Sequence, residues 1–126
     1  MKVLNIVSAG YRATLEEQDD TVIWLTHMLK KAGAEIDVLL RGSAANYVIE
    51  GQTVTPLTVG ERVQLHGPDV HGQTRGLAEA GVKIYVLEAD LKRRGAYDSP
   101  RLQQAEMLSS DALPGLLAQY DQVWHW

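Results

Sequence analysis

Two segments of the sequence repeat one pattern, and this repeat constrains the fold more than any other feature. Residues 32–39 (AGAEIDVL) and residues 80–87 (AGVKIYVL) match in residue type at every position except 37 and 85, which are aspartate and tyrosine. In each copy a glycine ends a helical stretch, a charged residue follows, and the chain then turns continuously apolar. Strands that are apolar throughout are covered on both faces, as parallel strands joined by right-handed helical crossovers are. We therefore predict an α/β fold with a mostly parallel sheet.

Further elements extend this alternation to about five strands in a single domain spanning residues 1–126. An opening strand at 3–7 runs into a small-residue loop, and a long helix with one apolar stripe follows; Thr14 and Glu17 have the spacing of a capping box at its start. Lys30, Lys31 and Gly33 suit the end of that helix. The remaining expected elements are a short helix at 43–49, an irregular stretch at 53–67, a helix at about 69–80, a turn or short helix at 90–95, an extended piece at 107–109, a helix from about 111 and a final strand within 121–126.

Charge and composition narrow the function classes. The formal net charge is −4 and the isoelectric point is near 5.5, so no positive field exists to gather phosphodiester backbones. No apolar run approaches the length of a membrane span, and the first residues do not resemble a signal peptide. We expect a cytoplasmic protein that binds neither nucleic acid nor membrane.

The order of elements resembles the DsrE/DsrF-like family, which includes YchN-like proteins. The resemblance rests on the pattern at 81–87 followed by Leu91-Lys92-Arg93-Arg94-Gly95, on the opening strand with its Ser8-Ala9-Gly10 loop, on the long first helix and on the closing region at 116–123. It implies a small flavodoxin-like or Rossmann-like three-layer fold and assembly into a trimer or hexamer. It also implies a role related to sulfur relay, because some members carry sulfur as a cysteine persulfide.

The chain contains no cysteine, so cysteine nucleophiles, thiolate metal sites and persulfides are excluded. The sulfur carriers that the chain resembles place their cysteine near the position of residues 87–90, where this sequence has Leu-Glu-Ala-Asp. Neither a hydrocarbon nor a carboxylate can form a sulfur–sulfur bond. We therefore expect a non-thiol DsrE-like protein that binds a small molecule or a partner within an oligomer. It would be accessory to sulfur metabolism and would not carry persulfide itself.

Polar and glycine residues follow the predicted strands, where ligands gather in open parallel sheets. Hydroxyl and amide groups offer neutral hydrogen bonds, arginines offer charge for a small anion, and glycines let a ligand approach the backbone. The candidate ligand-binding residues are Ser8, Gly10, Arg12, Arg41, Gly42, Ser43 and Asn46. The alternative is ordinary loop chemistry, in which Gly10 turns the chain and Ser43 caps the next helix.

Two further groups carry alternative chemistry. Asp90 or Glu88 is a candidate general base in an enzyme acting on a small anionic substrate, or else Asp90 caps the helix that follows it. His66 and His71, with Asp69 between them, are candidate ligands of a divalent metal, or else they are separate loop histidines. Since no cofactor-binding motif is present, we expect no cofactor. A scaffolding subunit that pairs with cysteine-bearing relatives is the third alternative.

Aromatic residues predict a homo-oligomer. Trp24 and His27 lie off the apolar stripe of the first helix, as a second buried face or a subunit contact would. Trp124 and Trp126 close the final strand and are too large to leave in water without a reason. Because aromatic side chains are enriched at subunit interfaces, we expect tryptophans in or near an interface of a trimer or hexamer.

Overall fold

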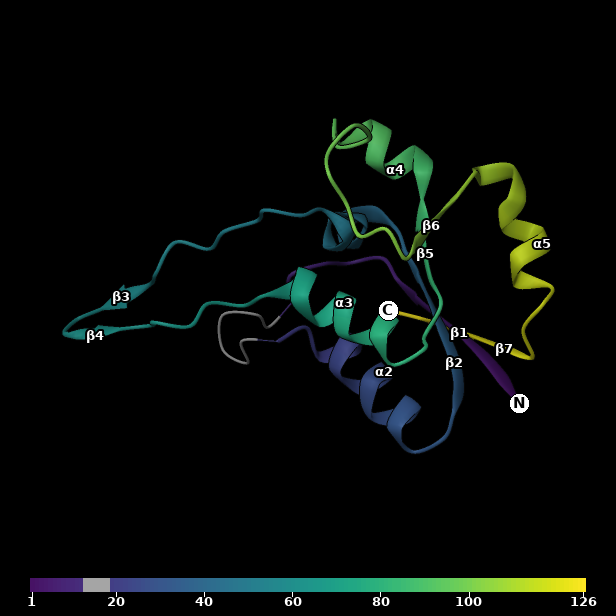
Figure 1. Ribbon diagram of the computed structural model, residues 1–126, viewed down its shortest axis with the longest axis horizontal. Helices are drawn as coiled ribbons and strands as arrows, with labels where there is room; N and C mark the ends of the chain where they lie inside the picture. Colours follow the sequence, from purple (N-terminus) through teal and green to yellow (C-terminus); the bar gives the residue numbers. More distant parts are fainter. Residues whose placement is uncertain (13–18) are drawn as a thin grey trace.

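Figure 1 shows the computed structural model, which describes residues 1–12 and 19–126. Its main sheet has five strands in the order β6-β5-β2-β1-β7, and every neighbouring pair is parallel. The prediction of an α/β fold with a mostly parallel sheet of about five strands is confirmed. The strands are β1 (Lys2–Val7), β2 (Glu35–Leu40), β5 (Ile84–Leu87), β6 (Ala105–Leu108) and β7 (Gln122–His125).

The two copies of the repeated sequence form neighbouring strands. Val38 pairs with Ile84 and Leu40 with Val86, so β2 and β5 lie together at the centre of the sheet. Gly33 and Gly81 both have positive φ, at 95° and 84°, as expected of residues that end a helix. One pattern used twice therefore makes two neighbouring interior strands that are buried along almost their whole length.

Helices cover both faces of the sheet and make three layers (Figure 1). Val38 and Leu40 face a core that includes residues of α2 and α3, whereas Leu39 faces a second core that includes Leu116 of α5. This alternation is what a strand buried on both faces requires. The helices are α2 (Thr21–Lys31), η1 (Gly42–Val48), α3 (Val70–Glu79), α4 (Glu88–Arg93), η2 (Ser110–Ala112) and α5 (Leu113–Leu117).

The helix starts refine the expectations from the sequence. Thr14 and Glu17 lie outside the described residues, and the described part of α2 is capped by Asp20, whose Oδ1 accepts from the N–H groups of Val22 and Ile23. Asp69 caps α3, close to the predicted start. In the part of the chain that the structure describes, no helix is long and apolar enough to cross a membrane.

The stretch expected to be irregular contains a two-stranded antiparallel ribbon. β3 (Thr58–Val59) and β4 (Arg62–Val63) meet at a turn in which Gly60 has a φ of 61°. Together with its flanks the ribbon forms a long arm that points away from the sheet and its helices (Figure 1). We call residues 51–67 the arm.

The strand order places a topological switch point between β1 and β7. The chain runs from β1 through β2 and β5 to β6 at one edge, then returns by way of α5 to the far side of β1. The connection from β1 to β2 and the connection from β6 to β7 therefore cross the sheet in opposite directions. In open parallel sheets ligands bind outside the carboxyl ends of the strands at such a point.

Candidate functional site

The three loops predicted to meet at the carboxyl ends of the strands do meet. The Gly10 N–H donates to the Ser43 hydroxyl at 2.7 Å, and the Gly42 N–H donates to Asp90 Oδ2 at 2.7 Å. A Cβ added at Gly42 would lie 2.4 Å from the Ser8 carbonyl oxygen, so only glycine fits there. The two glycines thus let the loops approach each other, and the space between β1, β2 and β5 is filled by backbone.

Ser43 does not cap a helix, contrary to one of the interpretations given above. The helix η1 begins at Gly42, its N-cap position is Arg41, and no side chain caps it. The Ser43 hydroxyl instead accepts from Gly10 in the loop after β1. The correction has a simple cause, because the helix starts two residues earlier than a cap at Ser43 would imply.

Asp90 does not cap a helix either. Helix α4 starts at Glu88 directly after β5, so Asp90 lies within its first turn, 4 % exposed. Its second carboxylate oxygen, Oδ1, pairs with Arg93 at 2.7 Å. Because both of its oxygens are engaged, Asp90 holds α4 against the loop after β2. To act as a general base it would have to break its hydrogen bond to the Gly42 N–H.

Glu88, the other candidate base, lies half-buried beside a lysine. Its carboxylate is 2.7 Å from the Lys92 ammonium, and their hydrogen bond raises the pKa of Lys92. Both residues line a small polar pocket of about 180 Å³ together with Ser109 and Ser110. The pocket therefore contains an ion pair and two hydroxyls.

The predicted arginines take different positions. Arg12 lines a pocket of about 250 Å³ together with Asp20, Thr21, Val22 and Trp126, on the β7 side of β1. Arg41 is half-buried, and its N–H donates to the Val7 carbonyl oxygen. Arg94, which was not among the predicted arginines, donates from Nε to the Gly42 carbonyl oxygen at 2.9 Å. Of these residues, only Arg12 lies on the switch-point side of the sheet.

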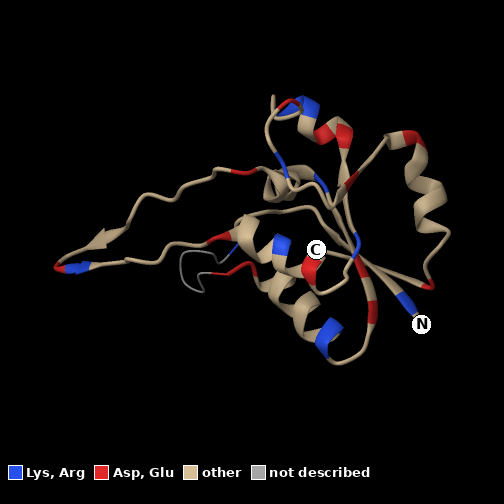
Figure 2. Cartoon of the chain, viewed as in Figure 1, with Lys and Arg blue, Asp and Glu red and all other residues tan. Residues whose placement is uncertain are grey.

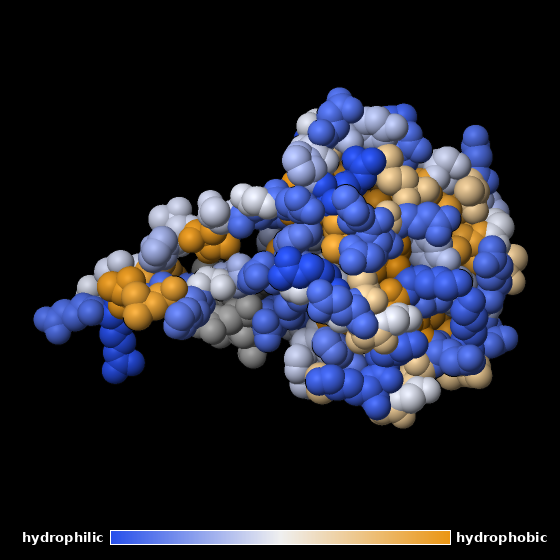
Figure 3. Space-filling model, viewed as in Figure 1, coloured by the Kyte–Doolittle hydropathy of each residue, from blue (hydrophilic) through white to orange (hydrophobic). Residues whose placement is uncertain are grey.

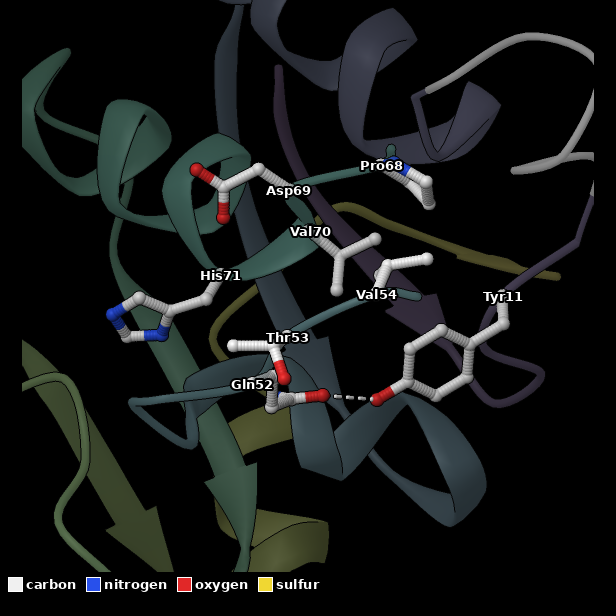
Figure 4. A pocket seen from close by; sticks show the side chains of 8 residues that line it. All are labelled: Tyr11, Gln52, Thr53, Val54, Pro68, Asp69, Val70 and His71. Carbon is white, nitrogen blue, oxygen red and sulfur yellow. Dashed lines mark hydrogen bonds between the residues drawn. The ribbon is translucent and has the colours of Figure 1, made fainter. Parts of the chain in front are cut away.

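A cavity of about 180 Å³ opens between the loop after β1, the base of the arm and the start of α3 (Figure 4). Tyr11 stands at its edge with a φ of 62°, a strained conformation for a residue with a side chain. Its hydroxyl donates to Gln52 Oε1 at 2.7 Å, and burial raises its pKa. The cavity is lined by Tyr11, Gln52, Thr53, Val54, Pro68, Asp69, Val70 and His71.

Tyr47 and Asp20 are buried next to Tyr11. The buried Tyr47 hydroxyl donates to Asp20 Oδ2 and accepts from the Tyr11 N–H at 2.5 Å. Burial, and then the hydrogen bond to Asp20, raises the pKa of Tyr47, so the phenol stays protonated. Sequence reasoning missed this group because Tyr47 and Asp20 are 27 residues apart and share no motif.

Asn46 was predicted to offer hydrogen bonds to a ligand. Its side chain bonds to the Tyr11 phenol, and its Oδ1 is buried with no hydrogen-bond partner among the described residues. Its backbone carbonyl accepts from Gln52 Nε2 at 2.6 Å. Asn46 therefore links the loop after β2 to the base of the arm, and it presents one unsatisfied acceptor there.

At the switch point, a serine and a histidine lie within hydrogen-bonding distance. Ser8 Oγ is 2.6 Å from His125 Nε2, and the Ser8 N–H donates to the Trp126 carbonyl oxygen at 2.9 Å. The Trp126 indole N–H donates to Asn5 Oδ1 at 2.5 Å, which fixes the end of the ladder between β1 and β7. The sequence had indicated Ser8 as a ligand-binding residue but not its partner His125, which is 117 residues away.

Beside this pair runs an open apolar groove of about 600 Å³. Leu25 and Leu29 of α2 form one wall, and Trp124, His125 and Trp126 form the other. Trp24 and Met28 stand exposed on the same helix, with half of the Trp24 surface in solvent. His27 instead lies against α3, where its ring comes within 3.9 Å of a Cβ built at Gly76. We call the surface lined by Leu25, Leu29, Trp124, His125 and Trp126 the α2–β7 groove.

The two candidate metal ligands do not form a site. His66 lies exposed in the arm, whereas His71 contacts the Tyr47 carbonyl oxygen through Nδ1 at 3.2 Å. Within residues 1–12 and 19–126, no three histidine, cysteine or acidic side chains cluster so that they can hold a metal ion. The two histidines are therefore separate, as the alternative held, but only His66 lies in a loop, because His71 is in the first turn of α3.

No protein-family model and no curated protein matches this sequence. The fold does match a solved structure, that of the ychN protein from E. coli, over the whole length of both chains. The TM-score is 0.74 and 15 % of the residues are identical. At this identity the likeness shows a YchN-like fold and nothing further, while the absence of cysteine is a property of the sequence itself.

Proposed function

We propose that this protein is a non-thiol relative of DsrE-like proteins that binds a small anionic molecule at the switch point, within a homo-oligomer. It acts as an accessory to sulfur metabolism without carrying persulfide. The observation that carries the proposal is the convergence of Ser8, His125 and the Arg12 pocket where β1 and β7 meet. The lack of any cysteine removes covalent sulfur transfer.

The chemistry of the switch point suits a small anion. Arg12 supplies a cation, Ser8 and His125 supply hydrogen-bonding groups, and Trp126 supplies an apolar wall. The carboxylate in this pocket, Asp20, is 2 % exposed, and it already accepts from Tyr47 and from the first turn of α2. Its charge is thus partly offset by donors. The pocket of about 250 Å³ is smaller than those that hold drug-sized ligands, so a ligand of few heavy atoms fits best.

The binding proposal is tested with inorganic anions and a matched pair of variants. Wild-type protein is titrated with sulfate, phosphate and thiosulfate while its melting temperature and its intrinsic tryptophan fluorescence are recorded. We expect saturable changes with at least one anion, weakened at least tenfold in Arg12→Gln and unchanged in Arg75→Gln, whose arginine lies exposed on α3. Equal losses in both variants, or no saturable change with any anion, contradict the proposal.

The non-thiol part of the proposal has its own test. After incubation with a persulfide donor and desalting, intact-mass spectrometry is expected to show the unmodified protein. A stable gain of one sulfur atom contradicts the proposal whatever the outcome of the anion titration. This measurement separates the role in sulfur chemistry from the ability to bind an anion.

The Ser8–His125 contact favours an enzyme as a second candidate function. A hydroxyl hydrogen-bonded to an imidazole is the arrangement that activates a nucleophilic serine. In such an enzyme His125 would be the general base, in place of Asp90 or Glu88. Among the described residues no carboxylate hydrogen-bonds to His125, whereas catalytic triads orient the base in that way. This candidate therefore ranks second. Labelling of Ser8 by a fluorophosphonate, lost in Ser8→Ala and reduced in His125→Asn, supports it, and absence of labelling rejects it.

The homo-oligomer, with a trimer or hexamer expected, is supported by exposed aromatic surface. Trp24 is 50 % and Trp126 is 43 % exposed, and Trp124 lines the groove between them. Such a patch is covered in closed assemblies. Light scattering coupled to gel filtration is expected to give three or six times the chain mass of 13.9 kDa, and a mass of 13.9 kDa at micromolar concentration contradicts the proposal.

A further inference from the structure

We infer that the arm of one copy of this chain docks in the α2–β7 groove of a second copy, so that the copies join arm to groove. The inference rests on the homo-oligomer proposed above and names the surfaces that hold it together. Both surfaces belong to the same chain, and both expose apolar side chains in the described part of the single copy.

The arm exposes more apolar surface than a solvated loop needs. Every residue from 51 to 67 except Gln64 is exposed, and Val59 and Leu65 are 69 % and 78 % exposed. Its charged side chains are confined to the tip, at Glu61 and Arg62 (Figure 2). Figure 3 shows hydrophobic residues gathered along the arm, away from the body of the protein. The exposed aliphatic residues are Val54, Leu57, Val59, Val63 and Leu65.

Both faces of the arm are apolar. Val59 lies opposite Arg62 and Thr58 opposite Val63, and the Gln64 N–H donates to the Leu57 carbonyl oxygen at 2.8 Å. Because side chains alternate along a strand, Leu57 and Val59 share one face, and Val63 belongs to the other. A two-stranded ribbon without a third strand or a helix beneath it is marginally stable in water. Contact with another surface removes this weakness.

The base of the arm is fixed, although its tip is free of the body. Gln52 accepts from the Tyr11 hydroxyl and donates to the Ile49 carbonyl oxygen at 2.9 Å. A Cβ at Gly67 would lie 3.1 Å from the Val54 side chain, so the outgoing and returning chains touch where they leave the body. A projection anchored at its base loses less conformational entropy on binding than a free loop does.

The α2–β7 groove offers the complementary surface. It is open, it is lined by two leucines, two tryptophans and His125, and among the described residues no carboxylate or ammonium group lies in its lining. Aliphatic side chains of the arm can therefore enter it without removing a charge from water. The groove also lies at the edge of the sheet, since β7 pairs with β1 on one side and is the last strand of the order. This position leaves it accessible to a second copy.

Contact between an arm and a groove is heterologous, because two different surfaces of the chain meet. Each copy gives one arm and receives one, which builds a closed ring when the rotation between copies closes. The arm spans residues 51–67, close to the roughly 20 residues that each side of a standard interface provides. The proposed contact is thus large enough to hold subunits together.

Cross-linking tests the contact directly, because the chain has no cysteine of its own. Leu65→Cys or Val59→Cys in the arm is paired with Leu29→Cys in the groove, either within one chain or by mixing two single variants. Under mild oxidation we expect disulfide-linked dimers from the arm and groove variants together, and none from any single variant alone. Dimers linked groove to groove, or no arm–groove dimer while wild type is oligomeric, overturn the inference.

Complementation provides a second, independent test. The arm variant Val59→Asp/Leu65→Asp and the groove variant Leu25→Asp/Leu29→Asp are each expected to run as a monomer with a native circular dichroism spectrum. An equimolar mixture is expected to form a heterodimer, because one intact arm still meets one intact groove. If the groove variant unfolds, Trp124→Glu replaces it.

The outcomes separate the inference from the proposal on which it rests. A monomeric wild type overturns both. An oligomer that survives the arm substitutions, or a mixture that stays monomeric, overturns the arm–groove contact alone and leaves the homo-oligomer standing.

Discussion

The loop after β2 and the tip of the arm use the same backbone conformation in opposite surroundings. Gly42 and Gly60 have φ values of 57° and 61°, which residues with a side chain rarely adopt. A Cβ at Gly42 would collide with the Ser8 carbonyl oxygen, whereas a Cβ at Gly60 would meet nothing within 4 Å. Glycine is required at position 42 because the loop after β1 leaves no room for a side chain, and at position 60 only because of the backbone conformation of the turn. The comparison separates positions fixed by tertiary packing from positions fixed only locally.

The comparison is tested most directly by replacing each glycine with alanine in a separate variant. The left-handed conformation costs alanine about 1–2 kcal/mol at either position, and displacing the loop after β1 adds a similar amount at Gly42. We expect Gly42→Ala to lower the free energy of unfolding by about 2–4 kcal/mol and Gly60→Ala by about 1–2 kcal/mol. Urea unfolding under monomeric conditions measures both, and equal losses would refute the distinction.

Removing the anchor of the loop after β2 sharpens the comparison further. Asp90→Ala leaves the Gly42 N–H and the Arg93 guanidinium without their acceptor, so we expect a loss of about 2–3 kcal/mol in the free energy of unfolding. Glu88→Ala in the same helix is the matched control and is expected to change little, because its lysine partner is solvated. A larger loss in the control would show that helix propensity dominates.

The Tyr47 hydroxyl makes the stability of the sheet and its helices depend on pH, whereas the arm contains no such group. Its pKa is raised above the ordinary 10.0 by burial and by Asp20, so the folded chain keeps a proton that the unfolded chain releases. The contribution of Tyr47 to the free energy of unfolding is therefore fully present below pH 10 and is lost as the pH rises above that value. We expect Tyr47→Phe to cost about 1–2 kcal/mol near neutral pH and to flatten the decline between about pH 9 and about pH 11.

Chemical denaturation of both proteins across that range measures the effect. Tyr97→Phe serves as a control, since no hydrogen bond from its hydroxyl to a described residue holds it. An unchanged slope in the Tyr47 variant would show that other tyrosines, such as Tyr120 beside Asp37, govern the alkaline limit.

The smallest effect is expected in the arm. Leu65→Ser removes an aliphatic side chain that is 78 % exposed, so the free energy of unfolding of the monomer should change by less than about 0.5 kcal/mol. Leu39→Ser is the contrasting variant, because Leu39 is fully buried in the sheet and is expected to lose several times more. A comparable loss in both variants would place the arm within the cooperative core.

The sheet could be predicted from the sequence because its signals are local. The two glycine-to-strand repeats, the Asp69 start of α3 and the apolar run of β1 each act over fewer than ten residues. The ribbon at the tip of the arm had a local signal too. Gly60 as the first residue of a two-residue turn, with β-branched residues at 58, 59 and 63, favours a hairpin.

The details of the candidate site could not be predicted because their partners are distant in the chain. Asp90 binds a backbone N–H that is 48 residues away, and Ser43 binds one that is 33 residues away. Each residue suited a helix cap by type, and the sequence held no signal for the longer contact. The same holds for Ser8 and His125, which come together only because β7 returns to the side of β1.

Asn5 is a polar residue in the middle of the apolar strand β1, and its two partners reach it at different times during synthesis. Its Nδ2 donates to Thr26 Oγ1, which is only 21 residues away, whereas its Oδ1 accepts from the Trp126 indole. The strand β7 emerges from the ribosome on the order of ten seconds after β1 at ordinary rates of translation. One end of the amide can therefore fasten β1 to the first helix early, and the other end holds the late strand in register once it arrives.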